Sequence, residues 1–204
     1  MALYSAILHN VFLLYHVETF VSVYKIDKTS FWIGETIFLV WNSLNDPLFG
    51  WLSDKGLLSK NSEKTDVVLK RLRALSWNGP FFAIAFLSFW FLWTYPALQF
   101  VICLCVYDSF LTMVDLHHSA LLADLVVSAS LRTRLNSYCS VFGAAGSLSV
   151  FLSYALWSKG SLDTFRIFCL VLSIASVIGY YLSTKFMIAT YKQTKKNEDP
   201  VEER

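Results

Sequence analysis

The chain has 204 residues, of which 55% are hydrophobic and only 16% are charged. Soluble domains carry about 25% charged residues, so this composition leaves too little charge to cover a water-facing surface. The soluble globular class is therefore excluded, and lipid must cover much of the surface. The net charge of +2 is small, and we expect no nucleic-acid partner.

Six segments are long and apolar enough to cross a bilayer as helices, which takes about 20 residues each. They cover residues 3–24, 31–53, 74–93, 97–123, 135–158 and 165–188. The first segment lacks the basic leader and small-residue cleavage site of a signal peptide, so we expect it to be retained. We predict an all-α membrane protein in which residues 1–188 form a bundle of six transmembrane helices and residues 189–204 form a charged cytoplasmic tail.

Basic residues are distributed unevenly between the two ends of the predicted bundle. They are frequent in the connections after the second and fourth spans and after the sixth span. The opposite connections carry only Lys25, Lys28, Lys159 and Arg166. Because Lys and Arg are enriched in cytoplasmic loops, this pattern predicts that both termini are cytoplasmic. We expect the plasma membrane to be the location.

The second span contains an amide and a carboxylate one helical turn apart. Asn42 and Asp46 are separated by four residues, so their oxygens project from the same helix face. Pro47 has no N–H, which frees the carbonyl oxygen of Ser43. These oxygens are the ligands that a small alkali cation or a proton site needs. The alternative is that Asp46 pairs with a basic side chain elsewhere in the bundle.

The fourth span carries two carboxylates on one face. Asp108 and Asp115 are seven residues apart, which predicts that they line the bundle interior or an aqueous cavity. Asp115 is the stronger candidate for binding a solute because Thr112, His118 and Ser119 lie at neighbouring helical positions. Charged groups within a span are costly and usually functional, so each of these carboxylates calls for a partner or a ligand.

Other polar residues give weaker indications of chemistry. Asp124 is close in sequence to Arg132 and Arg134, which predicts an ion pair at the cytoplasmic rim. His117 and His118 are adjacent and diverge by about 100° on a helix, so we expect no metal site. No nucleophile, base and acid have the spacing of a catalytic site. We therefore expect neither an enzyme nor a cofactor.

Residues 45–55 (NDPLFGWLSDK) resemble the second-span signature of the melibiose-carrier group. These proteins are the glycoside–pentoside–hexuronide:cation symporters of the major facilitator superfamily. Gly50, Asp54 and Lys55 also resemble the start of the superfamily's loop 2–3 motif, which implies a conformational gate. Asp115 and residues 132–138 (RTRLNSY) are further matches, and the resemblance covers essentially the whole chain.

The resemblance implies that Asp46, with Asn42, belongs to a cation site for Na⁺ or H⁺. It also implies that Asp115 binds substrate together with Asn10, and Ser119 lies beside them. Asn42 and Asn10 stand where sugar-transporting relatives often have acids, and Cys139 stands at a position that is often arginine. These departures leave both a sugar and an amphiphile as expected substrates.

Transporters of this superfamily have twelve spans in two halves, with substrate held between the halves. This chain matches the N-terminal half, so we expect a shortened form, or a bundle that pairs with a second six-helix half or another copy. The first functional hypothesis is half of a cation-coupled symporter for a small organic solute. The alternative is a non-transporting membrane protein that acts as an interaction or regulatory partner.

Overall fold

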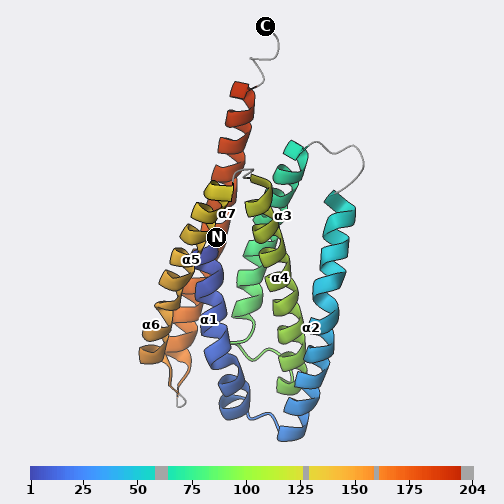
Figure 1. Ribbon diagram of the computed structural model, residues 1–204. Helices are drawn as coiled ribbons and strands as arrows, with labels where there is room; N and C mark the ends of the chain where they lie inside the picture. Colours follow the sequence, from blue (N-terminus) through green and yellow to red (C-terminus); the bar gives the residue numbers. More distant parts are fainter. Residues whose placement is uncertain (58–63, 126–128, 159–160, 199–204) are drawn as a thin grey trace.

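A computed structural model describes residues 1–57, 64–125, 129–158 and 161–198, and all regular structure in these ranges is helical. The elements are α1 (Ala2–Glu18), the π-helix η1 (Thr19–Val23), α2 (Lys28–Leu57), α3 (Lys64–Leu87), α4 (Pro96–Leu125), α5 (Ala129–Ser147), α6 (Ser149–Leu156) and α7 (Asp163–Glu198). Because η1 continues α1 and α6 continues α5, the described residues form six long helical segments. Successive segments run in opposite directions along the bundle (Figure 1). The predicted all-α class is confirmed.

Four of these helical segments are long and apolar enough to cross a membrane. They are Ala2–Val23, Pro96–Leu125, Ala129–Leu156 and Asp163–Lys196, among the residues that the structure describes. The helices α2 and α3 are also long, but neither is among these four. The six predicted helices are therefore present, whereas membrane crossing by α2 and α3 remains a prediction.

The boundaries of several helices differ from the predicted spans: α3 begins ten residues earlier than expected, at Lys64, and α5 begins six residues earlier, at Ala129. The third span was expected at 74–93, but α3 ends at Leu87. The buried side chain of Gln99 explains this end, because its amide nitrogen donates to the carbonyl oxygens of Ser88 (3.0 Å) and Phe91 (2.8 Å). These bonds satisfy backbone groups of a connection whose apolar sequence resembles a span. At the other end of the chain, α7 continues to Glu198.

The helices are arranged with α1 and α4 in the middle of one face, flanked by α5 and α2, and with α3 and α7 behind them (Figure 1). Two glycines permit close helix contacts. A Cβ atom on Gly146 of α5 would lie 2.9 Å from the backbone oxygen of Leu3 in α1, and one on Gly79 of α3 would lie 2.4 Å from the ring of Tyr180 in α7. Small residues allow membrane helices to approach in this way.

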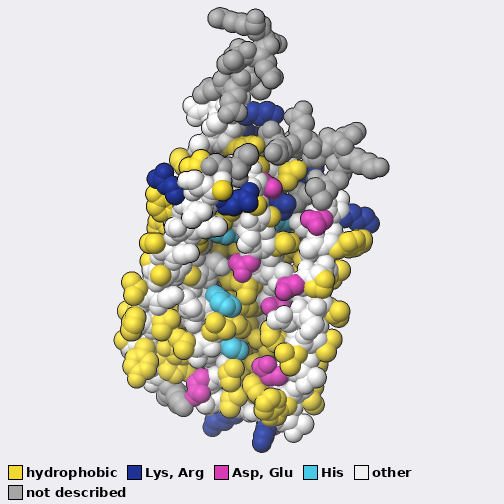
Figure 2. All heavy atoms as spheres, in the orientation of Figure 1, with side chains coloured by type: hydrophobic (Ala, Val, Ile, Leu, Met, Phe, Trp, Pro, Cys, Tyr) yellow, Lys and Arg dark blue, Asp and Glu magenta, His cyan; other side chains and the backbone are white. Residues whose placement is uncertain are grey.

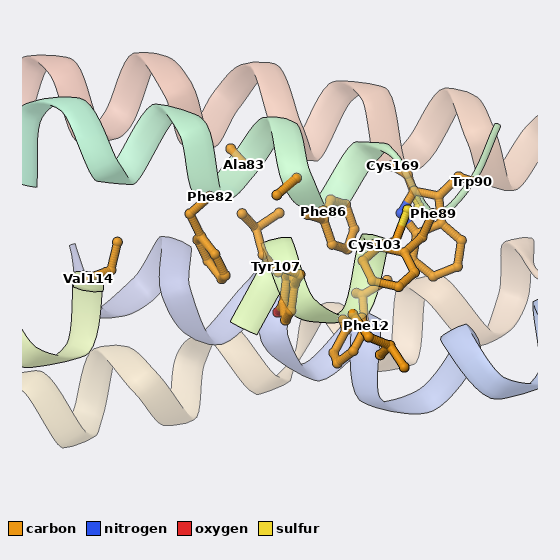
Figure 3. Close-up of a cluster of buried hydrophobic side chains, with 14 of the residues drawn as sticks. Phe12, Phe82, Ala83, Phe86, Phe89, Trp90, Cys103, Tyr107, Val114 and Cys169 are labelled. Carbon is orange, nitrogen blue, oxygen red and sulfur yellow. The ribbon is translucent and has the colours of Figure 1, made fainter. Parts of the chain in front are cut away.

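Aromatic rings fill the core where α1, α3 and α4 meet. The ring centroids of Phe12 and Tyr107 are 4.1 Å apart, and the Phe82 ring lies 5.0 Å from Tyr107 (Figure 3). Phe89 meets Phe12 edge-on at 5.0 Å. Such offset and edge-on arrangements are favoured by the ring quadrupoles and add to the dispersion energy of packing. The core therefore fixes α1 against α4, the two helices that carry the candidate solute site.

The first residues of α1 and the last described residues of α7 lie toward the same end of the bundle, as does the start of α3 (Figure 1). At this end the guanidinium Nε of Arg71 in α3 donates to a carboxylate oxygen of Asp124 in α4 at 2.6 Å. The predicted ion pair at the rim is therefore formed by a residue of the neighbouring helix, Arg71, which closeness in sequence did not indicate. The packing of α3 against α4 brings Arg71 next to Asp124.

Candidate functional site

Acidic and histidine side chains gather along the middle of one face of the bundle, over α1 and α4 (Figure 2). Hydrophobic and uncharged groups surround them. Charged and polar groups at membrane depth face the bundle interior or a water-filled cavity. The polar residues of this face fall into two groups, one between α2 and α4 and one between α1 and α4.

The first group, which we name the α2–α4 polar network, consists of Asn45, Asp46, Asp108 and Thr112. The side-chain amide of Asn45 is fully buried and donates to Asp108 Oδ2 at 2.7 Å and to Thr112 Oγ1 at 3.1 Å. The hydroxyl of Thr112 donates in turn to Asp46 Oδ1 at 2.9 Å. The hydrogen bonds thus form a chain that connects two adjacent residues of α2 with two residues one turn apart on α4.

One acceptor in this network lacks a partner. The carbonyl oxygen Oδ1 of Asn45 is buried and makes no hydrogen bond. A buried polar atom without a partner is rare and often marks the place of an ion, a water molecule or a functional group. The network also contains the carboxylates of Asp46 and Asp108 and the hydroxyl of Thr112, which are hard oxygen atoms of the kind that an alkali cation prefers.

Sequence reasoning identified only part of this network. Asp46 belongs to it through the hydrogen bond from Thr112, although its side chain is exposed, whereas Asn42, one turn earlier on α2, is exposed and lies outside the network. Asn45 and Asp108 were not chosen as site residues, although both were visible as polar residues in apolar segments. The signal that would have identified Asp108 is its position one turn before Thr112, because both face α2.

The second group surrounds a cavity of about 220 Å³ between α1 and α4. His9 of α1 and Asp115 and His118 of α4 line this cavity, and Tyr180 of α7 lies at its edge. Nδ1 of His9 is 3.3 Å from the hydroxyl of Tyr107, which ties the imidazole to the aromatic core. The cavity therefore offers one carboxylate and two imidazoles to a polar ligand.

A larger and more apolar cavity of about 440 Å³ shares His118 with the first one. Tyr138, Cys139 and Phe142 of α5 contribute to its wall, so the thiol-bearing Cys139 borders this space. The two cavities have walls in common and differ in polarity. Together they offer a polar region and an apolar region to a ligand.

The remaining predicted solute residues lie apart from this cavity. The amide nitrogen of Asn10 donates to Ser147 Oγ at 3.0 Å, which joins α1 to α5. Ser119 is exposed on α4. The structure therefore groups Asp115 with His118, which helical spacing places beside it, and with His9, which sequence reasoning did not choose for a solute site.

The predicted gate residues occupy the last turns of α2. A Cβ atom added to Gly50 would meet nothing within 4 Å, and Asp54 and Lys55 are exposed. The ammonium nitrogen of Lys55 lies 4.8 Å from the centroid of the Trp51 ring. These side chains are free to meet a neighbouring bundle, and their gating role remains a prediction.

A bundle of long helices, four of them apolar enough to cross a bilayer, defines a multi-pass membrane protein. The chain is a close homologue of transmembrane protein 180. It is 66% identical to transmembrane protein 180 of Gallus gallus over 192 residues and 57% identical to transmembrane protein 180 of Mus musculus over 203 residues. The matches cover 92% and 97% of this chain but only 38% and 39% of these relatives.

No family model and no solved structure matches the chain. The resemblance based on residues 45–55 and 132–138 also includes a likeness to transmembrane protein 180 in particular, and that likeness is confirmed. Membership of the major facilitator superfamily remains a prediction that depends on residues 45–55 and on the order of the helices.

Proposed function

We propose that the chain forms half of a cation-coupled secondary transporter for a small organic solute. The α2–α4 polar network carries this proposal. The support is a hydrogen-bonded chain that joins the buried Asp108 of α4 to the exposed Asp46 of α2 and contains a buried amide oxygen without a hydrogen-bond partner. Such groups are costly at membrane depth and mark ion pathways and proton relays.

In the proposed cation site, Asp46 supplies charge and Thr112 orients its carboxylate through the 2.9 Å hydrogen bond. Asn45 holds Asp108 with its amide nitrogen and offers its free Oδ1 to the ion. The ion is Na⁺ if these oxygens coordinate it together, and it is a proton if one carboxylate is protonated in the loaded state. Both ions suit a site made of oxygen atoms.

In the proposed solute site, Asp115 accepts hydrogen bonds from solute hydroxyl groups. His9 and His118 line the same 220 Å³ cavity, and the neighbouring apolar cavity receives a less polar part of the solute. A solute with a polar and an apolar region fits this arrangement. Alternating access requires a second bundle, either a second six-helix half or another copy, that moves against this face.

The cation site is tested by binding of ²²Na⁺ to the purified chain in lipid nanodiscs. We expect saturable binding to the wild-type chain and loss of binding in Asp46→Asn and Asp108→Asn. Glu35→Gln is the matched control, because Glu35 is a carboxylate of α2 outside the network. Equal saturable binding in all four proteins would contradict the assignment of the site, and no binding in any of them would exclude Na⁺ as the ion.

Transport is tested in proteoliposomes, with a radiolabelled disaccharide and a lysophospholipid as probes. The proposal predicts uptake that requires an imposed Na⁺ or proton gradient and that Asp46→Asn abolishes. Uptake that is independent of both gradients and unchanged by Asp46→Asn would refute coupling. Cation binding without uptake of either probe by the chain, alone or paired with a second bundle, would favour the non-transporting role.

A further inference from the structure

An elongated groove of about 500 Å³ lies between α3 and α7, the two helices behind the polar face. We name it the α3–α7 groove. Residues important for its chemistry are Trp77, Pro80, Phe81 and Ile84 from α3 and Tyr181 and Lys185 from α7. It contributes nothing to the α2–α4 polar network, so its occupant is a separate question.

The groove is a consequence of how the two helices are packed. Gly79 allows the ring of Tyr180 to lie directly against the backbone of α3, which brings the helices together on the inner side. Pro80 follows immediately and has no N–H to donate to the carbonyl oxygen of Ser76, one turn back. The hydroxyl of Ser173 in α7 donates to the carbonyl oxygen of Ala83 at 2.8 Å and fixes the helices further along. On the outer side of this helix pair, the space between α3 and α7 therefore stays open as the groove.

The walls of the groove form a continuous apolar stripe. Trp77 is 69% exposed and Ile84 is 55% exposed, and Phe81 lies between them at 44%. The rings of Trp77 and Phe81 are stacked with centroids 6.4 Å apart. Tyr181 faces them from α7 and is 52% exposed. Exposed apolar side chains in this arrangement match the shape and chemistry of a hydrocarbon chain.

One end of the groove is basic. The ammonium nitrogen of Lys185 donates to the Tyr181 hydroxyl at 3.3 Å and lies 5.3 Å from the centroid of that ring. Arg73 is exposed one turn before Trp77 on α3, toward the same end of the bundle. The residues that line the groove include no carboxylate to neutralise this charge.

The basic end coincides with the edge of the predicted membrane region. Trp77 lies in the first turn of the span 74–93 and Lys185 in the last turn of the span 165–188. Tryptophan is enriched at the level of lipid headgroups, and lysine extends its ammonium group to the same level. The polar end of the groove is thus placed where a headgroup would lie, and its apolar part points toward the bilayer interior.

We propose that the α3–α7 groove is a binding site for one anionic phospholipid. An acyl chain lies along Phe81 and Ile84, Trp77 packs at the level of the glycerol, and Lys185 binds the phosphate. Charge complementarity selects an anionic lipid over a zwitterionic one, because basic pockets between membrane helices bind anionic headgroups. Free phosphate has the charge but not the chain, so it is a poor ligand for the same groove.

Native mass spectrometry of the full chain measures which lipid is retained after purification from equal amounts of phosphatidylglycerol and phosphatidylcholine. We expect preferential retention of phosphatidylglycerol. The variant Lys185→Gln should reduce that retention about fivefold, which corresponds to the loss of one basic group near a membrane surface. Lys192→Gln is the control, because it removes the same charge from an exposed position two turns further along α7.

A second measurement uses fluorescence quenching by trace phosphatidylglycerol with brominated chains in an excess of phosphatidylcholine. Trp77→Phe should remove the high-affinity component of quenching, whereas Trp51→Phe, an exposed tryptophan on α2, should keep it. Inorganic phosphate at matched ionic strength should not displace the lipid. Equal retention of both lipids, equal effects of Lys185→Gln and Lys192→Gln, retention of the high-affinity component in Trp77→Phe, or displacement by phosphate would each overturn the proposal.

Discussion

The amide nitrogen of Asn45 lies 2.7 Å from a carboxylate oxygen of Asp108 and connects α2 to α4 in the buried part of their interface. The same amide also reaches Thr112. Because α2 packs mainly against α4, this residue has a structural task that is separate from cation binding. Loss of the structural role would lower the free energy of unfolding, whereas loss of the cation site would lower ion binding.

Asn45→Ala should destabilise the bundle by roughly 1–3 kcal/mol, because it removes two hydrogen bonds and leaves a buried carboxylate without its donor. The free energy of unfolding can be measured by titrating the detergent-solubilised chain with sodium dodecyl sulfate. The control is Asn42→Ala, an exposed asparagine one turn earlier on the same helix, which should change stability by less than about 0.5 kcal/mol. Equal effects of the two variants would show that the buried hydrogen bonds do not hold α2.

The ion pair between Arg71 and Asp124 should contribute a measurable coupling between α3 and α4. The Arg71 side chain is 11% exposed and that of Asp124 is 35% exposed, so the pair is only partly screened by water. A double-mutant cycle with Arg71→Gln and Asp124→Asn should give a coupling energy of about 0.5–1 kcal/mol. The same cycle with Arg134→Gln serves as the comparison, and a larger coupling there would favour the partner suggested by closeness in sequence.

Gly79→Ala should lower the Tm of the chain, because the new methyl group would lie 2.4 Å from the Tyr180 ring. Forcing extra volume into a packed contact costs about 1–3 kcal/mol. Gly143→Ala should have the opposite sign, since a Cβ atom there meets nothing within 4 Å and alanine favours helix by about 0.5–1 kcal/mol over glycine. Thermal unfolding of both variants checks this contrast, which a similar Tm shift in both would refute.

Three of the four cysteines should react with maleimide in an order set by their positions. Cys139 lines the larger cavity and should be modified in the native chain. Cys103 and Cys169, which are 1% and 0% exposed, should react only after unfolding. Mass spectrometry of peptides from native and unfolded samples measures this order. Modification of Cys103 at the native rate of Cys139 would be inconsistent with the described core.

Much of the fold follows from hydrophobicity along the chain, because a helix is the only way for a single segment to satisfy its backbone within lipid. The end of α3 could not be read in this way. Residues 88–93 are nearly as apolar as a span, and only the buried amide of Gln99 reveals that their backbone groups are satisfied by a side chain. A tertiary contact of this kind has no signature in local composition.

The candidate site also contains residues that the sequence identifies and contacts that it does not. Asp46 could be identified because a carboxylate beside a proline in an apolar segment is unusual. Its relationship to Asp108 depends on the rotation of α4 against α2, which spacing within one helix does not determine. Sequence reasoning therefore favoured Asp115, which shares a face with Asp108 but borders the cavity with His9. The residue that each carboxylate contacts depends on helix packing, which the sequence alone does not determine.

The link between Asn45 and Asp108 also has a consequence for the synthesis of the chain. The two residues are separated by 63 positions, so α2 emerges from the ribosome well before α4 exists. Until then the amide and carboxylate groups of α2 have no intramolecular partners from α4, and lipid offers none. If α2 crosses the bilayer as predicted, we expect its stable integration to wait for α4. The order of biogenesis, and any factor that shelters a nascent polar helix, would then be part of how this bundle is assembled.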